Sequence, residues 1–320
     1  MTDRFVVTGG AGFIGSNIVK ALNKRGIENI TVVDRLNLDA KKKNLTSLKF
    51  SDYQDKAEFR EMVRKNDLGK IKTVFHMGAC SSTTEMDEDY LKDNNFLYSK
   101  ELCEWCLKNT TRFIYASSAA TYGNGSLGYS DNDELCPKLS PLNPYGRSKQ
   151  MFDLWVLENN LLNRVAGLKY FNVYGPGEDH KGDMRSVVNK AYSQVLNTGE
   201  IRLFKSYKPE YEDGKQERDF IYVADAVDAT LFFHDHPEVS GIFNCGTGKA
   251  RTWIDLANAV FAAMEKTPKI VFIDMPEEIR DKYQYHTQAD MTKLRKAGYK
   301  TPFTELEDGV KDYVRNYLSK

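Results

Sequence analysis

Short apolar runs alternate with amphipathic stretches along the first half of the chain. Apolar runs at 5–8, 30–34, 73–76, 112–117 and 166–171 predict strands, and apolar residues at helical spacing predict helices at 14–24, 90–108 and 145–162. Parallel strands need right-handed crossovers, which the intervening helices supply. The pattern therefore predicts an α/β fold with a doubly wound parallel sheet.

The alternation ends after the segment Tyr174-Gly175-Pro176-Gly177. Residues 178–220 are more polar and contain a charged insert at 208–217, whereas 220–223 and 241–244 look like strands that return to the core and 269–273 like a further strand. We expect two lobes. The first comprises residues 1–172 plus about 221–247, and the second, a smaller mixed α/β lobe, comprises about 173–220 plus 248–320.

Composition excludes several classes of function. Lys+Arg and Asp+Glu are both 45, so a net charge of +0 gives no reason to expect a nucleic-acid partner. No apolar stretch approaches the length of a membrane span, and the N-terminus carries no signal-peptide pattern. Five cysteines do not form a disulfide scaffold, and the CxxC of Cys103 and Cys106 falls within a predicted helix, as core thiols do. We expect a cytoplasmic protein with no metal site.

A glycine-rich segment, TGGAGFIG at 8–15, joins the first predicted strand to the first helix. Gly9 permits a tight turn, Gly12 admits a pyrophosphate, and Gly15 allows close packing of helix and strand. Asp34, at the end of the second strand, suits the ribose hydroxyls of NAD. The basic residues that follow, Arg35, Lys41 and Lys56 among them, suit the 2′-phosphate of NADP instead. The residues by themselves leave this choice open.

Tyr145 and Lys149 lie four residues apart, behind Pro144 at a predicted helix start. A cation near a tyrosine stabilises the phenolate and lowers the pKa of the phenol. The pair therefore suggests an acid/base group that exchanges a proton with a substrate hydroxyl. The alternative for such a pair on its own is a half-solvated tyrosine and lysine at a helix start.

Three segments together resemble the extended short-chain dehydrogenase/reductases, which act largely on nucleotide sugars. They are the glycine loop, YASSAATYG at 115–123, and the Tyr145/Lys149 pair. The resemblance implies that Ser118 hydrogen-bonds the reacting hydroxyl. It also implies that Lys149 holds the nicotinamide ribose and lowers the pKa of Tyr145.

Further segments are similar to the ADP-L-glycero-D-manno-heptose 6-epimerase family: GACSSTTE at 78–85, DNN at 93–95, YFNVYGP at 170–176, HKG at 180–182 and TQAD at 287–290. The similarity runs from about residue 4 to 318. It implies a cytoplasmic, NADP-using homo-oligomer, pentameric in known members. Such an enzyme converts ADP-D-glycero-β-D-manno-heptose to its L-glycero epimer for the lipopolysaccharide inner core.

The same resemblance assigns contacts residue by residue. For NADP these are Phe13, Ile14, Asp34, Arg35, Lys41, Lys56, Met77, Gly78, Ala79, Cys80, Ser81, Asn94, Lys149, Val173 and Lys181. For the ADP-heptose they are Asn172, Asp183, Lys190, Phe204, Lys205, Ser206, Tyr207, Arg218 and Tyr283. Asp183, Lys190, Lys205 and the 208–217 insert depart from the best-known members of the family, which puts individual substrate contacts in question.

Epimerisation at C6 implies transient oxidation to a ketone and return of hydride to the opposite face. Tyr145 is aligned with one orientation of the oxygen, so a second acid/base is needed, and Lys181 is the candidate by resemblance. Its alternative is a phosphate-binding or surface lysine. For Arg218, the expected role is to bind substrate phosphates, and the alternative is a surface ion pair with Asp219.

Two rival functions stay open at this stage. One is a UDP-hexose 4-epimerase or 4,6-dehydratase, although Ala119 and Ala120 stand where a dehydratase usually carries an acid pair. The other, from a different class, is a dinucleotide-binding sensor or structural protein without turnover. Such relatives tend to lose the tyrosine or the lysine of the pair, and both are present here.

Overall fold

A seven-stranded parallel sheet forms the larger part of the molecule, in a computed structural model that describes residues 3–36, 39–280 and 283–320. The strand order is β10-β6-β5-β4-β1-β2-β3. The strands are β1 (Phe5–Thr8), β2 (Ile30–Asp34), β3 (Asp52–Asp55), β4 (Thr73–His76), β5 (Arg112–Ser118), β6 (Val165–Tyr170) and β10 (Gly241–Cys245). This arrangement confirms the predicted doubly wound α/β fold.

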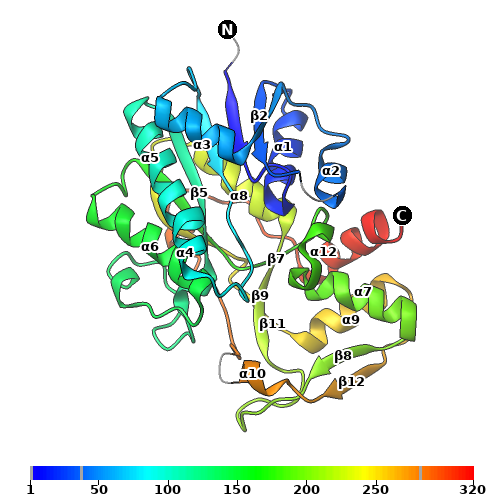
Figure 1. Ribbon diagram of the computed structural model, residues 1–320. Helices are drawn as coiled ribbons and strands as arrows, with labels where there is room; N and C mark the ends of the chain where they lie inside the picture. Colours follow the sequence, from blue (N-terminus) through cyan, green and yellow to red (C-terminus); the bar gives the residue numbers. More distant parts are fainter. Residues whose placement is uncertain (1–2, 37–38, 281–282) are drawn as a thin grey trace.

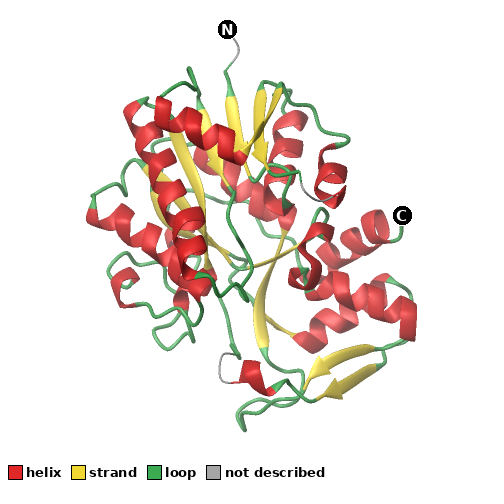
Figure 2. Cartoon of the chain, viewed as in Figure 1, coloured by secondary structure: helices red, strands yellow, loops and turns green. Residues whose placement is uncertain are grey.

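Helices cover both faces of the sheet (Figures 1 and 2). One hydrophobic core joins a face of the sheet to α1 (Phe13–Lys24) and α8 (Val223–Asp235). A second core joins the other face to α3 (Lys56–Lys65), α5 (Tyr98–Lys108) and α6 (Pro144–Glu158). Cys103 and Cys106 are buried on α5 in this second core, and both thiols are free, as predicted.

Several short helices connect these layers. They are α2 (Asp39–Leu45), α4 (Glu88–Leu91), the 3₁₀ turns η2 (Ala119–Tyr122) and η3 (Cys136–Lys138), and the π-helical segment η1 (Lys92–Leu97). Together α4, η1 and α5 form the long helix predicted at 90–108. The π-helical segment places Asn94 and Asn95 at its buried side, where both contribute to the site described below.

The remaining elements form a smaller lobe with two small sheets, β11-β9-β7 and β12-β8. Its elements are β7 (Asn172–Tyr174), η4 (Asp179–Met184), α7 (Val187–Thr198), β8 (Ile201–Phe204), β9 (Glu217–Tyr222), β11 (Ala250–Thr252), α9 (Trp253–Ala263), β12 (Ile270–Ile273), α10 (Glu277–Arg280), α11 (Thr292–Lys296), α12 (Leu306–Tyr313) and η5 (Val314–Leu318). Among the described residues, no helix is long and apolar enough to cross a membrane.

The run at 220–223 is buried in the core, as predicted, but it does not belong to the main sheet. Its residues end β9, which pairs with β7 in parallel and with β11 in antiparallel orientation. The chain then enters α8 at Val223, and only the later run re-enters the main sheet, as β10 beside β6. The exact boundaries between the two lobes stay a prediction.

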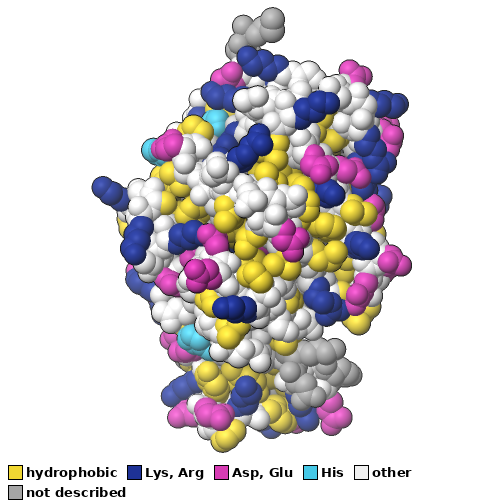
Figure 3. All heavy atoms as spheres, turned by 90° about the vertical axis from the view of Figure 1, so that its left-hand side faces the viewer, with side chains coloured by type: hydrophobic (Ala, Val, Ile, Leu, Met, Phe, Trp, Pro, Cys, Tyr) yellow, Lys and Arg dark blue, Asp and Glu magenta, His cyan; other side chains and the backbone are white. Residues whose placement is uncertain are grey.

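Figure 3 shows the side of the molecule that carries α4 and α6. Apolar side chains gather there in the middle of the face, among scattered charged groups. Met86, before α4, is 68% exposed, and Leu97, at the end of η1, is 36% exposed.

Candidate active site

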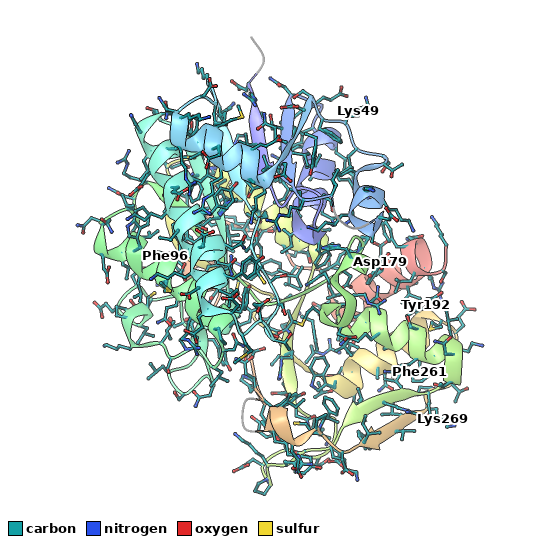
Figure 4. All side chains as sticks on the ribbon, viewed as in Figure 1. Lys49, Phe96, Asp179, Tyr192, Phe261 and Lys269 are labelled. Carbon is teal, nitrogen blue, oxygen red and sulfur yellow. The ribbon has the colours of Figure 1, made fainter. Side chains whose placement is uncertain are left out.

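A cleft of about 560 Å³ lies at the carboxyl ends of the central strands. Thr8, Asp34 and Ser118 line it from the ends of β1, β2 and β5, and Tyr170 lines it from the end of β6. In open α/β sheets, ligands bind at this edge. In Figure 4 the labelled Phe96 and Asp179 belong to η1 and η4, two segments that supply opposite walls of the cleft.

The glycine loop forms the floor of the cleft and leaves no room for side chains. Gly9 has a φ of +65°, and a Cβ added at Gly15 would lie 2.1 Å from the Gly9 carbonyl oxygen. The loop is tied to β2 because the Ala11 N–H donates to Oδ2 of Asp34 at 3.0 Å. No side chain caps the first turn of α1, so its N–H groups point into the cleft region, as in dinucleotide-binding helices.

Gly15→Ala is therefore expected to destabilise the protein by about 1–3 kcal/mol and to lower its cofactor content, because the new methyl group meets backbone that cannot rotate away. Melting temperature and cofactor content of the purified variant measure both effects. Gly26→Ala is the control: Gly26 has a φ of +75° but open space around it. The control should lose about 1 kcal/mol and keep its cofactor. Equal cofactor content in both variants would contradict the prediction.

Asp34 stands at the centre of a basic cluster. Its carboxylate, 7% exposed, accepts from the Arg35 N–H at 2.7 Å and forms an ion pair with Lys41 at 2.7 Å. Lys56 donates to Asn94 Oδ1, and burial, followed by the charge of Arg35, lowers the pKa of its ammonium. All of these side chains line the cleft. The cluster thus contains both an acceptor for ribose hydroxyls and cations for a phosphate.

The segment 77–81 crosses the cleft wall between the glycine loop and α6. The Cys80 N–H donates to Asn95 Oδ1 at 2.8 Å, and the Asn95 amide donates back to the Cys80 carbonyl at 3.0 Å. The same amide also donates to Ser148 Oγ at 2.9 Å. Asn95 therefore holds the 77–81 segment against the helix that carries Tyr145 and Lys149.

Tyr145 and Lys149 lie on the first turns of α6, which begins at Pro144 and is capped by Asn143. The side chain of Lys149 is buried, and its Nζ donates to the Ala116 carbonyl at 2.8 Å. Burial lowers the pKa of Lys149 to about 8. Ser118, at the end of β5, caps the following turn by accepting from Ala120 N–H at 3.1 Å.

The phenol does not follow the simple expectation from the sequence. Burial raises the pKa of Tyr145 above its ordinary value, and the hydrogen bond with Ser118 acts in the opposite direction. Lys149 donates one of its three N–H groups to the Ala116 carbonyl, and for Tyr145 the burial of the phenol outweighs the hydrogen bond with Ser118.

Lys181 reaches the cleft from η4. Its Nζ lies 5.4 Å from the centroid of the Phe13 ring, and burial lowers the pKa of its ammonium while Glu178 acts in the opposite direction. Glu178 is buried, and Ser186 Oγ donates to its carboxylate at 2.6 Å, which fixes the start of the turn. Gly182, which directly follows Lys181, has a φ of +53°, a backbone conformation in which a side chain would be strained. Lys181 is thus a half-buried, cleft-lining amine and not a surface lysine.

The predicted substrate contacts fall into two groups. Asn172, Asp183 and Lys190 line the cleft together with all the predicted cofactor contacts. The others lie beyond its described lining, namely Phe204, Lys205, Ser206, Tyr207, Arg218 and Tyr283.

Arg218 belongs to an aromatic cluster next to the cleft. It is 6% exposed, and its guanidinium lies 5.1 Å from the Tyr283 ring and 5.4 Å from the Trp253 ring. Trp253 itself lines the cleft and donates to the Tyr283 hydroxyl at 2.8 Å. The alternative of a surface ion pair with Asp219 is excluded, because the Asp219 carboxylate is buried and accepts from the Thr247 N–H at 2.7 Å.

The segment 204–207 is held by charged neighbours on the smaller lobe. Lys205 and the Tyr207 hydroxyl each lie 3.1 Å from Oδ1 of Asp274. The Ser206 N–H donates at 2.7 Å to Asp213, which belongs to the charged insert. The insert therefore packs against the predicted substrate segment and supports its backbone.

Several cleft residues were missed from the sequence: Thr83, Tyr90, His180, Met184, Arg185 and Trp253. His180 precedes Lys181 in the HKG segment, so its position gave a signal. Trp253 gave none, because an aromatic residue at a helix start is equally typical of a core. Among the described residues, no cluster of His, Cys, Asp and Glu could hold a metal ion.

Comparisons with known proteins agree with this geometry. The model of the NAD dependent epimerase/dehydratase family matches residues 5–246. The chain is 56% identical over 316 residues, 98% of each protein, to the ADP-L-glycero-D-manno-heptose-6-epimerase of Nitratidesulfovibrio vulgaris strain DP4. The crystal structure of the Helicobacter pylori enzyme of the same name matches with a TM-score of 0.84 and 28% identity over 99% of this chain and 97% of that one. The UDP-glucose 4-epimerase of Thermus thermophilus, solved in complex with NAD, matches with a TM-score of 0.77 and 27% identity over 97% of each chain.

Proposed function

Because this chain belongs to the NAD dependent epimerase/dehydratase family, we propose that it epimerises C6 of ADP-D-glycero-β-D-manno-heptose to give the L-glycero sugar nucleotide. The observation that carries the proposal is the joint placement of Tyr145, Ser118 and Lys181 around one cleft that also contains the glycine loop. The extent of identity with an enzyme of that name supports the choice of substrate.

The cleft fits a nicotinamide dinucleotide. The glycine loop is so tight that a single Cβ at Gly15 would clash with it, and the start of α1 has no side-chain cap. Both features suit a pyrophosphate. Asp34 would take the ribose hydroxyls of its adenosine, and Lys149 those of its nicotinamide ribose. When bound, this cofactor accepts a hydride from a carbinol carbon and returns it. We propose NADP in preference to NAD, since Arg35, Lys41 and Lys56 surround Asp34 with positive charge.

The proton chemistry rests on residues of this chain. Tyr145 takes the proton of the C6 hydroxyl in one orientation, while Ser118 donates a hydrogen bond to the same oxygen as charge develops. Once C6 is planar and the sugar has reoriented, the Lys181 ammonium donates a proton to the oxygen in its second position; in the reverse direction the neutral amine takes that proton and Tyr145 donates. Burial lowers the pKa of Lys181, so a larger fraction of the amine is neutral and able to act as a base.

The decisive experiment incubates the purified protein with ADP-D-glycero-β-D-manno-heptose and follows the configuration at C6 by NMR. Conversion to a mixture of the two epimers is expected, with no net change in the cofactor. Parallel samples contain UDP-glucose, the substrate of the rival 4-epimerase reading. Turnover of UDP-glucose alone would replace the proposal by that rival. Bound cofactor without turnover of either sugar would favour a sensor or structural protein.

The preference for NADP has its own test in Lys41. Lys41→Met is expected to weaken NADP binding about tenfold, since one cation near a phosphate contributes about 1–2 kcal/mol, and to change NAD binding less than about twofold. Titration of protein stripped of cofactor gives both constants. Lys42→Met is the control, because Lys42 is exposed and pairs with the exposed Asp39. Equal losses for NADP and NAD would contradict the assignment.

The same proposal places the protein in the cytoplasm, as a homo-oligomer that supplies the L-glycero heptose of the lipopolysaccharide inner core. The exposed apolar side chains of Met86 and Leu97 support self-association, because a water-facing surface gains by covering such groups. We expect a pentamer, the assembly implied by the resemblance to the ADP-L-glycero-D-manno-heptose 6-epimerase family. Light scattering of the purified protein measures it directly.

A further inference from the structure

A buried ion pair lies behind the candidate active site, between α6, β5 and β6. Nζ of Lys169, on β6, is 2.7 Å from Oδ2 of Asp153, on α6, and the two side chains are 3% and 0% exposed. Two hydroxyls from β5 also donate hydrogen bonds to the Asp153 carboxylate: Tyr115 donates to Oδ1 at 2.9 Å and Ser117 to Oδ2 at 2.7 Å. Lys169 also donates to Thr121 Oγ1 at 2.7 Å. Both carboxylate oxygens and two of the three N–H groups of the ammonium are therefore hydrogen-bonded.

Stability alone is a poor reason for such a pair. Moving two charges out of water costs about as much as, or more than, their attraction returns, and apolar residues of similar volume are often equally stable in the same place. The pair is also absent from the lining of the cleft, so it does not touch a ligand there. Its position relative to Lys149 offers a different reason.

Asp153 follows Lys149 by four residues on α6, so the two side chains lie on one face of the helix, one turn apart. Lys149 donates to the carbonyl of Ala116 at 2.8 Å. Ala116 lies between Tyr115 and Ser117, the two residues of β5 that donate to Asp153. Three consecutive residues of β5 thus attach to α6 through Lys149 and Asp153. The next residue of the strand is Ser118, the proposed donor to the reacting oxygen.

Asp153 also acts on Lys149 through its charge. Burial lowers the pKa of Lys149 to about 8, and the Asp153 carboxylate is the first of the groups that act to raise it. Cys80 acts in the same direction, and burial, followed by the charge of Lys149, lowers the pKa of His76 on β4. Asp153 in turn faces Cys136 and Lys169. A carboxylate one turn away favours the ammonium form of Lys149.

We propose that Asp153 is a positioning residue of the reaction: it fixes Lys149 as an ammonium against β5, in register with Tyr145 and Ser118, and Lys169 holds Asp153 in place. This inference rests on the roles proposed above for Tyr145 and Lys149. It goes beyond them because it assigns a function to two residues that touch neither substrate nor cofactor.

The first test is Asp153→Asn, which keeps the shape of the side chain and removes its charge. Turnover at pH 8 is expected to fall about tenfold or more with KM changed less than about twofold, as when one ionic contact to a working group is lost. Without the carboxylate, the pKa of Lys149 falls, and Lys149 works in its protonated form. The alkaline limb of the pH–kcat profile should therefore move to lower pH, by about one unit.

A second variant separates this role from a merely structural one. Asp153→Asn leaves Lys169 buried without its partner, which by itself destabilises the fold. Asp153→Asn/Lys169→Met removes both charges and is expected to recover most of the melting temperature while the alkaline limb stays shifted. Recovery of both wild-type turnover and the wild-type limb in this double variant would overturn the proposal. If the single variant does not fold, the double variant alone decides.

Asp131→Asn is the matched control. Asp131 is also a buried carboxylate, 5% exposed, and accepts from the backbone N–H of Asn244 at 2.8 Å, with no bond to α6. Its loss is expected to lower the melting temperature and to leave the alkaline limb in place. A shift of the limb equal to that of Asp153→Asn would mean that any buried carboxylate has this effect, and the proposal would fail.

A measurement that needs no turnover keeps this inference distinct from the proposed function. The titration of Lys149 is followed by carbon NMR of cofactor-loaded protein labelled at the lysine ε-carbons, with the signal assigned by its loss in Lys149→Met. The midpoint is expected at lower pH in the double variant than in the wild type. Equal midpoints overturn the role of Asp153. If the wild type does not epimerise the sugar nucleotide, the proposed function fails while this comparison still decides about Asp153.

Discussion

Replacing Tyr145 with phenylalanine is expected to lower kcat by about a thousandfold while leaving the fold and cofactor content unchanged. The phenol lines the cleft and shares a hydrogen bond with Ser118 at the end of β5, and loss of a general acid/base costs about 10²–10⁴ in rate. Since the ring of Tyr145 is buried and phenylalanine keeps it, packing is preserved. The assay is epimerisation at C6, followed by NMR.

Tyr299→Phe is the matched control for that variant. Tyr299 is a similarly buried tyrosine whose hydroxyl donates to Asp228 at 2.9 Å, far along the chain from the cleft lining. It is expected to lose about 1 kcal/mol of stability and to keep wild-type turnover. If Tyr145→Phe retained more than about a tenth of wild-type turnover, Tyr145 would not be the acid/base group.

The second large effect is expected from Lys181→Met, which should lower turnover about a hundredfold and keep the cofactor bound. The two-base proposal makes a sharper claim about half-reactions. With one sugar epimer, Tyr145 starts the reaction, and with the other, Lys181 does. Each variant should therefore block reduction of the bound cofactor, read from nicotinamide absorbance in single-turnover experiments, with a different epimer.

Lys20→Met serves as the control for Lys181. Its Nζ lies over the Tyr317 ring at 5.1 Å, much as Lys181 lies over Phe13, but outside the cleft. Wild-type rates are expected for this control. A single-base enzyme would behave differently: Tyr145→Phe would block both epimers and Lys181→Met neither. That outcome would remove Lys181 from the mechanism and leave Tyr145 in it.

Most of the main sheet was predictable because its buried strands consist largely of apolar residues. The edge strand β3, Asp-Tyr-Gln-Asp, is polar and partly exposed, and it was not predicted. Residues of β1, β2 and β4 are buried on both sides and read as continuous apolar runs, each followed by a helix. The run that ends β9 is equally apolar, and its burial was predicted correctly. The strands with which it pairs were not predicted, because an apolar run indicates that a strand is buried but does not indicate to which sheet the strand belongs.

The position of the proposed cofactor half of the cleft was predictable for a related reason. The glycine loop, Asp34 and the 77–81 segment each follow a strand of the sheet, and strand ends of a parallel sheet meet at one edge. The substrate half is built differently. Trp253 and Tyr283 come from separate parts of the smaller lobe and meet only through tertiary packing around Arg218. No spacing of residues in the sequence predicts that these side chains are in contact.

The protonation states of Tyr145 and Lys149 could be predicted from the sequence only in part. Four-residue spacing placed Tyr145 and Lys149 on one face of α6 correctly. It could not reveal that burial raises the pKa of the phenol, or that Lys149 donates to the backbone of β5. Asp153 illustrates the same limit, because its partners come from two strands, and the 115–123 motif that contains Tyr115 and Ser117 gives no sign that these residues meet α6.

The position of β10 at the edge of the main sheet has a consequence for synthesis of the protein. β6 pairs with β5 on one side and with β10 on the other, and all six of its residues are buried. While the chain is being made, β6 emerges long before residues 241–245 exist. A nascent chain that stalls between these points presents an apolar, unpaired strand edge to other chains. Premature stop codons in this interval should therefore yield products that aggregate or require a chaperone, whereas the completed chain closes its own sheet.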